Sequence, residues 1–312
     1  MTRRDLALHL AVIAILAVLG LVLPAYHHTN TARIMLLAVY AMGYNIAFGY
    51  TGLLSLGHAL FFGAGLYATG LLMELGGVPA GLALPAGVLA GGAMAGAVGL
   101  LALRTAGVSF MIVTLMFAQA GYLTVMYFTS YTRGEEGFNL ARAARAVGGL
   151  DLSQDGIRYG VALVLFAVAL LGKLWLVRSR LGRVMVAMRE NEERSRMLGY
   201  DPFRAKLVAL VLSGLYAGAA GAAYGVMFGY VGASFVAVQF SILPLLWVLL
   251  GGAGTTLGPL LGVGLMFYLI DIASGQTTAH LAVIGVALLV LVLFAPRGVL
   301  GVVRERLVKW LP

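Results

Sequence analysis

Long apolar runs recur along almost the whole chain and limit the folds that are open to it. A membrane-spanning helix needs about 20 consecutive, mainly apolar residues. Charged residues make up only 11% of the 312 residues, against 61% hydrophobic residues, which leaves too little polar surface for a domain folded in water. The sequence therefore predicts an all-α polytopic membrane protein, with residues 1–312 in one transmembrane domain. About ten spans are expected, at residues 6–24, 32–49, 58–75, 80–103, 107–128, 159–177, 205–228, 241–254, 256–273 and 280–296.

The distribution of basic residues indicates how the chain lies across the membrane. If the first span begins inside the cell, 16 Lys and Arg residues fall on the inner side and five on the outer side. This excess agrees with the tendency of basic residues to remain in the cytoplasm. We therefore expect a multi-pass protein of the cell inner membrane, with both termini cytoplasmic and residues 129–158 in a periplasmic loop. The net charge of +9 follows from the same bias and does not indicate a nucleic-acid partner. The inner group comprises Arg3, Arg4, Arg104, Lys173, eight residues within 178–206, Arg297, Arg304, Arg306 and Lys309.

Residues 178–206 are the most highly charged segment of the chain. They hold eight of its 21 Lys and Arg residues and four of its 12 Asp and Glu residues. Apolar side chains recur there at i, i+3, i+4 and i+7, which predicts a surface helix with one apolar face. Gly199 is expected to end this helix, and Asp201 and Pro202 to cap and begin the next. The segment is either a solvated loop that sets orientation or a docking surface for a soluble partner, and the amphipathic pattern favours docking. The apolar positions are Leu181, Val184, Met185 and Met188.

Glycine, with 43 residues, is the second informative feature of the sequence. Pairs four residues apart lie within the predicted spans, where they allow helix backbones to approach closely. The stretches 49–70 and 251–264 contain too many glycines for a continuous helix. Broken backbone at membrane depth persists only where protein buries it or where it lines a watery cavity. We therefore expect both stretches to border a translocation path. The pairs are Gly87/Gly91, Gly92/Gly96, Gly214/Gly218, Gly221/Gly225, Gly225/Gly229 and Gly258/Gly262.

The chain carries no pattern that indicates catalysis. It has no cysteine, no His or carboxylate pair at metal-ligand spacing, and no phosphate-binding G-x-x-x-x-G-K-[ST] motif. We therefore expect no catalytic residue, metal or cofactor, and no ATP hydrolysis by this chain itself. A coupled carrier normally keeps an ionisable group near mid-membrane, whereas Glu74 and Asp271 lie at predicted outer helix ends. The energy for transport is therefore expected to come from elsewhere. Small polar groups are expected to border the path instead, namely Asn45, Ser55, His58, Gln119 and Thr255.

Three segments, in the same order as in a known family, resemble the permease subunits of branched-chain amino-acid ABC importers of the LivM and LivH types. They are YNIAFGYTGLLSLGHALFFGAGLYATGLL (44–72), VRSRLGRVMVAMRENEERSRMLGYDPFRAKLVALVLSGLYAGAAGAAYG (177–225) and WVLLGGAGTTLGPLLGVG (247–264). The resemblance covers about residues 30–300 and is specific for the family but not for the substrate. Relatives carry urea, short amides and aromatic amino acids. The outer loop departs from the family pattern, because it reads TRGEEGFNL where relatives tend to have Gly-Gly and a small acidic pair.

The resemblance implies an architecture similar to that of type II importers, with about ten helices around a central path. Its partners would be a second, LivH-like permease, two ATP-binding subunits and a periplasmic substrate-binding protein, with membrane lipid around the permeases. Residues 178–206 would form the cytoplasmic coupling loop, with Gly199 as its turn. The residues that would couple the permease to the ATP-binding subunits are Arg189, Glu190, Glu192, Glu193, Arg194, Arg196 and Gly199.

Two other classes of function remain open at the level of the sequence. A passive channel for a small neutral solute would account for the glycines and the scarcity of charge, but not for the charged amphipathic segment. A secondary transporter would need a coupling residue, for which Asp271 is the best candidate. An ABC permease for urea or short amides is a further alternative to one for branched-chain or related amino acids.

Overall fold

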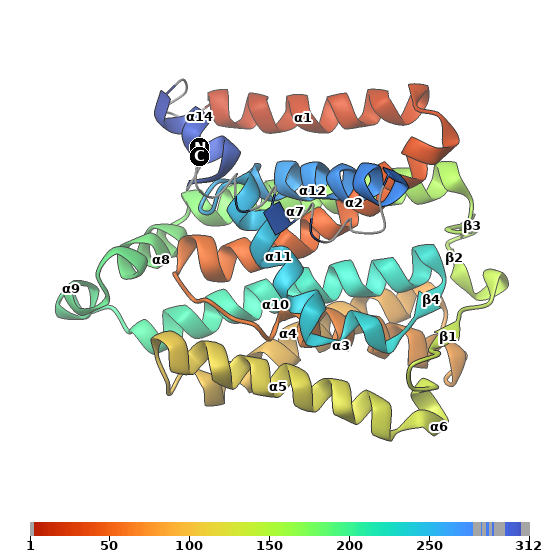
Figure 1. The fold of residues 1–312 in the computed structure, drawn as a ribbon, viewed down its shortest axis with the longest axis horizontal. Coiled ribbons are helices and arrows are strands. Elements are labelled where there is room, and N and C mark those ends of the chain that lie inside the picture. The colour runs from red at the N-terminus through yellow and green to blue at the C-terminus, as the bar shows by residue number, and fades with distance from the viewer. Residues whose placement is uncertain (1–2, 277–281, 283–284, 287–288, 290–296, 307–312) are drawn as a thin grey trace.

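In the computed structural model, helices follow one another through most of the chain and lie side by side in a bundle (Figure 1). The structure describes residues 3–276, 282, 285–286, 289 and 297–306. Within this part of the chain, nine of the ten predicted spans coincide with helices, and the tenth, 280–296, lies outside the described residues. The nine helices are α1 (Arg3–Val22), α2 (Ala25–Asn45), α3 (His58–Glu74), α4 (Ala80–Ala102), α5 (Gly107–Tyr127), α7 (Asp155–Arg178), α10 (Pro202–Phe228), α11 (Val238–Gly251) and α12 (Gly258–Gln276).

Seven helices in the described part of the chain are long and apolar enough to cross a membrane. The helices α3 and α11 are shorter, with 17 and 14 residues. All-helical spans are the expected solution in lipid, because each helix satisfies its own backbone hydrogen bonds. The chain is therefore a multi-pass membrane protein.

The two ends of the bundle differ in structure (Figure 1). At one end, the helix-pair end, α8 (Arg180–Glu190) and α9 (Glu192–Met197) project beyond the long helices, near α14 (Gly298–Arg306). At the other, the strand end, lie short elements in the two connecting segments, residues 128–154 and 229–237. They are α6 (Thr129–Thr132), β1 (Phe138–Asn139), the 3-10 helix η2 (Arg142–Arg145), β2 (Ala146–Val147), β3 (Leu150–Asp151), β4 (Tyr230–Val231) and the 3-10 helix η3 (Ala233–Phe235).

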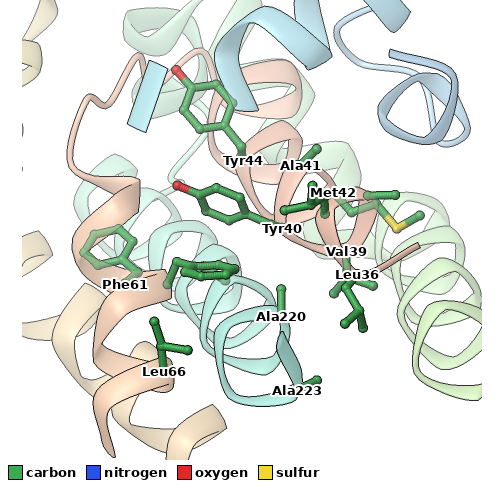
Figure 2. Packing of buried hydrophobic residues seen from close by; sticks show 14 of the residues in the cluster. Leu36, Val39, Tyr40, Ala41, Met42, Tyr44, Phe61, Leu66, Ala220 and Ala223 are labelled. Carbon is green, nitrogen blue, oxygen red and sulfur yellow. The ribbon is translucent and has the colours of Figure 1, made fainter. Parts of the chain in front are cut away.

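The helix α2 forms the centre of the bundle. Every residue from Asn30 to Asn45 is buried except Arg33, so α2 contacts protein on all sides. Aromatic rings pack around it, with the Tyr40 ring 5.0 Å from that of Phe62 and 5.5 Å from that of Phe240. Figure 2 shows Tyr40 and Tyr44 of α2 beside Phe61 and Leu66 of α3, with Ala220 and Ala223 of α10 close by. Small residues on α10 thus leave room for the aromatic residues of α2 and α3.

Glycines bring α3, α4 and α10 into backbone contact. A Cβ atom added to Gly65 would lie 2.3 Å from the carbonyl oxygen of Gly218, and one added to Gly91 would lie 2.5 Å from the Gly218 Cα. A Cβ on Gly87 would lie 2.7 Å from the Gly65 carbonyl oxygen. Such distances leave no space for any side chain. The interpretation of Gly87/Gly91 and Gly214/Gly218 as helix-packing faces is therefore confirmed.

A short two-stranded sheet ties the connecting segment 128–154 to the segment that follows α10. The strands β1 and β4 pair antiparallel, with Phe138 opposite Val231. Gly229 ends α10 with φ +73°, a conformation that favours glycine, and the Arg145 guanidinium lies against it. Burial lowers the pKa of Arg145 from its usual value. The loop predicted at 129–158 is thus partly ordered, and α7 begins within it at Asp155.

The helix α2 begins at Ala25, seven residues before the predicted span at 32–49. Polar side chains in its first turns have partners on neighbouring helices, which explains why the helix extends beyond the apolar run. The Tyr26 hydroxyl donates to Asp271 Oδ1 at 2.6 Å, and the His28 ring stacks on that of Tyr159 with centroids 4.3 Å apart.

Candidate functional site

The two glycine-rich stretches interrupt helices, as predicted. After α2 the chain forms one π-helical turn, η1 (Ile46–Tyr50), and residues 51–57 are then not helical until α3 begins. Residues 252–257 separate α11 from α12 in the same way. We call residues 51–57 the first break and residues 252–257 the second break. The rest of each stretch is helical, because its glycines pack against other helices.

The Asn45 side chain joins the last turn of α2 to the second break. Its Nδ2 donates to the Thr255 carbonyl oxygen at 2.7 Å, and its Oδ1 accepts from the Gly254 backbone N–H at 2.9 Å. The Asn45 side chain is completely buried and Thr255 is 1% exposed. Asn45 thus forms hydrogen bonds with the Gly254 N–H and the Thr255 carbonyl oxygen, two backbone groups that lie outside any helix and so lack helical partners. Two of the predicted path residues, Asn45 and Thr255, are therefore in direct contact.

A buried lysine holds the second break from the side of α7. Lys173 Nζ donates to the carbonyl oxygens of Thr255 and Thr256, each at 3.3 Å, and its side chain is completely buried. A ring nitrogen of His9 in α1 is hydrogen-bonded to Thr256 Oγ1 at 2.7 Å. The position of Lys173 in the sequence placed it on the inner side but did not reveal these contacts. The signal for them was a lysine inside a predicted span, five residues before Arg178.

Side chains from three helices form hydrogen bonds to the first break and the start of α3, and two of them accept from backbone N–H groups. His58 is hydrogen-bonded through Nε2 to Ser213 Oγ of α10 at 2.7 Å. The Ala59 N–H donates to Ser241 Oγ of α11 at 2.8 Å, and the Leu56 N–H donates to Thr114 Oγ1 of α5 at 3.1 Å. Ser55 Oγ accepts from the Gly57 N–H within the break itself. The predicted path residues Ser55 and His58 are therefore buried in protein contacts.

Gln119 lies apart from the other four predicted path residues. It is exposed on the outer face of α5, near the middle of that helix. The surrounding exposed side chains on α5 are apolar, including Ile112, Met116 and Leu123. The five residues thus form two groups: four buried beside the breaks, and Gln119 on a surface.

The charged segment folds as two short capped helices, whereas the sequence predicted a single surface helix that ends at Gly199; Asn191 interrupts that helix and caps the second one. Ser179 caps α8, Asn191 caps α9 by accepting from the Arg194 N–H at 2.8 Å, and Asp201 caps α10 by accepting from the Arg204 N–H at 3.2 Å. Gly199 makes the turn between α9 and α10 with φ +88°. The predicted apolar face of α8 is turned inward, because Met185 and Met188 are buried and Leu181 and Val184 are half-buried.

The predicted coupling residues point in two directions. Arg189 is exposed as a whole, but its guanidinium turns toward the bundle, where Nη1 donates to the Gly49 carbonyl oxygen in η1. Glu192 pairs with Lys206 of α10 through a 2.5 Å contact, which fixes α9 against the bundle. The other residues leave their charges exposed on the surface of the helix pair, namely Glu190, Glu193, Arg194 and Arg196.

Arg189 also borders a cavity of about 500 Å³ at the helix-pair end. This cavity lies against the first break, with Thr51 and Leu54 on one side and Phe110 of α5 on the other. Glu192 and Lys206 close it at the side of the helix pair. Arg189 therefore connects the helix pair to the broken backbone in two ways, by its hydrogen bond and by the cavity that it lines. Within the described part of the chain, no group of His, Asp or Glu side chains could hold a metal ion.

A helical bundle with two broken helices inside it and a charged helix pair at one end is the architecture of a membrane permease. The chain belongs to the family of the permease component of the branched-chain amino acid transport system, which matches residues 29–295. This is a family of ABC permeases with the type II fold. The sequence-based identification of the family and of the fold is thus confirmed.

Curated relatives agree with this family. The high-affinity branched-chain amino acid transport system permease protein LivM of Escherichia coli is 28% identical over 296 residues, covering 88% of this chain and 69% of the relative. The corresponding LivH protein of E. coli is 25% identical over 284 residues, covering 85% and 91%. A probable LivM protein of Methanocaldococcus jannaschii is 33% identical over 89 residues, covering 28% and 26%. No solved structure matches the chain at a significant level.

Proposed function

We propose that this chain is the membrane-spanning subunit of an ATP-driven importer of branched-chain or related amino acids in the cell inner membrane. The observation that carries the proposal is the Arg189 contact with Gly49, because it links a surface helix pair to broken backbone inside the bundle. An ATP-binding subunit that docks on the helix pair would be coupled through this contact to the broken backbone inside the bundle. The LivM and LivH relatives of E. coli, which match most of this chain, are permeases of branched-chain amino acid transport systems.

The helix-pair end is proposed to face the cytoplasm. Two ATP-binding subunits would dock there on the exposed charges of Glu190, Glu193, Arg194 and Arg196. The amphipathic helix pair favours docking over the interpretation as a solvated loop, because its caps and the salt bridge between Glu192 and Lys206 fix its geometry. The strand end would then face the periplasm, where a substrate-binding protein would deliver the amino acid. Residues 1–312 would form a single permease domain.

A second, LivH-like permease is proposed to cover the exposed face of α5. Gln119 supports this assignment, since an amide facing hydrocarbon in mid-membrane would lack hydrogen-bond partners. Covered by a second permease, Gln119 would border the path between the two subunits. The buried residues Asn45, Ser55, His58 and Thr255 would shape the same path by holding the two breaks in place.

The test is uptake of radiolabelled leucine into proteoliposomes that contain this chain, its partner permease, the ATP-binding subunits and the binding protein. We expect uptake only with ATP inside the vesicles, and none when the ATP-binding subunits are omitted. Uptake driven by an imposed proton or sodium gradient would contradict the proposal and favour a secondary transporter. Gradient-driven uptake that fails after Asp271→Asn would assign the coupling to that carboxylate, which accepts from Tyr26 at the strand end.

The same vesicles separate the alternative substrates and the channel. Competition by unlabelled valine, phenylalanine, urea and acetamide would rank the substrate classes. Equilibration of leucine across the membrane without accumulation would indicate a channel and would contradict ATP-driven import.

A further inference from the structure

A cavity of about 380 Å³ at the helix-pair end has four arginines among the eleven residues that line it. It lies between the end of α7, the helices α8 and α14, and the backbone of Gly49 and Gly254. Arg189 separates this cavity from the 500 Å³ cavity beside the first break, because it lines both. The charged residues around the smaller cavity are Arg178, Arg183, Arg189, Arg304 and Glu190.

The arginines of this cavity outnumber the carboxylates that could neutralise them. Arg178 pairs with the buried Asp5 at 2.6 Å, outside the cavity lining. Glu190 is the acidic residue among the lining residues. Neither Arg183 nor Arg304 forms an ion pair with any carboxylate that the structure describes. Arg189 uses one donor on Gly49, which leaves further N–H groups of its guanidinium available. Arg183, Arg189 and Arg304 thus carry three positive charges without a described ion-pair partner, and Glu190 in the lining reduces the excess to two.

Tyr50 gives the cavity a further feature of an anion site. Its side chain is 4% exposed, and its hydroxyl has no hydrogen-bond partner among the described residues. Arg178, Arg189 and Arg304 line the same cavity as Tyr50. A buried hydroxyl without a partner is unfavourable, and a phenol can donate to an anion. Three guanidinium groups and one hydroxyl donor thus converge on the same region.

We propose that this cavity binds the phosphate group of an anionic phospholipid. Basic pockets between helices at the cytoplasmic face are suited to such headgroups, because guanidinium groups bind phosphate oxygens in pairs. The cavity lies at the end of spanning helices, close to α1, whose outward side chains Ile15 and Val18 are exposed and apolar, as lipid contact requires. The excess of two charges matches a headgroup with two phosphodiesters or two singly charged lipids. The proposal does not depend on ATP-driven import.

The test uses the full-length permease, purified, stripped of lipid and placed in nanodiscs of phosphatidylcholine with or without cardiolipin or phosphatidylglycerol. Native mass spectrometry measures the lipid retained after release from the disc. We expect anionic lipid to be retained over phosphatidylcholine, and retention to fall about fivefold for each of Arg183→Ala and Arg304→Ala. Arg104→Ala is the matched control, since Arg104 is an exposed arginine at the same end and does not line the cavity.

Tyr50→Phe removes only the hydroxyl and should weaken retention while the thermal unfolding midpoint in phosphatidylcholine stays unchanged. Equal retention by the wild type, the two arginine variants and the Arg104 control would overturn the proposal. Displacement of the lipid by millimolar inorganic phosphate would assign the cavity to a free anion and would also overturn the proposal.

Discussion

Removal of the Asn45 amide tests whether one side chain holds the second break in place. In the Asn45→Ala variant the Gly254 N–H loses the side-chain acceptor at 2.9 Å, and the Thr255 carbonyl loses the donor at 2.7 Å. Thr255 keeps a second donor, because Lys173 Nζ lies 3.3 Å from the same oxygen. The main consequence is therefore one unpaired backbone N–H at Gly254, which is half-buried, so its cost falls toward the lower end of the range for a buried donor.

The expected loss of stability follows from these contacts. A buried donor left without an acceptor costs about 1–3 kcal/mol. Hydrogen bonds between helices in membranes average about 0.6 kcal/mol and reach about 1.7 kcal/mol, so the weakened contact at Thr255 adds little. We expect Asn45→Ala to lower the free energy of unfolding by about 1–3 kcal/mol.

The measurement is unfolding of the purified permease in mixed micelles by titration with SDS. Asn139→Ala is the control, since Asn139 is an exposed asparagine in β1, and its replacement should change the free energy of unfolding by less than about 0.5 kcal/mol. In reconstituted vesicles the Asn45 variant should also transport leucine more slowly. If Asn45→Ala unfolds at the same SDS fraction as Asn139→Ala, then the second break is held by other contacts and the reasoning is refuted.

Two further predictions concern helix packing and docking. Gly65→Leu should reduce the yield of folded permease strongly, because its Cβ would lie 2.3 Å from the Gly218 carbonyl oxygen, whereas Gly160→Leu should be tolerated, because no atom lies within 4 Å of its Cβ. Size-exclusion chromatography measures both, and equal yields would contradict the packing argument. Glu193→Arg should prevent co-purification of the ATP-binding subunits without changing stability, whereas Glu192→Arg should also lower the thermal unfolding midpoint, because it breaks the pair with Lys206. Normal co-purification of the Glu193 variant would contradict docking and favour the interpretation of this segment as a solvated loop.

Features that depend on neighbouring residues could be predicted from the sequence. The amphipathic helix α8, the turn at Gly199 and the start of α10 at Asp201 and Pro202 all follow from patterns within a few residues. The interruption at 252–257 was also predictable, because closely spaced glycines destabilise a helix wherever they occur. The start of α2 was predicted too late, because its polar first turns find partners on α7 and α12.

The sequence by itself determined which segments of this protein span, break and turn, since hydropathy, glycine content and capping act over a few residues. Only the tertiary structure decided which segments meet. Asn45 and Thr255 are 210 residues apart in the chain, and no local pattern in either segment encodes their hydrogen bond. The burial of Lys173 and the inward direction of Arg189 also depend on how neighbouring helices pack. Contacts of this kind are set by the packing of the whole bundle, because broken backbone must find partners wherever the other helices place them.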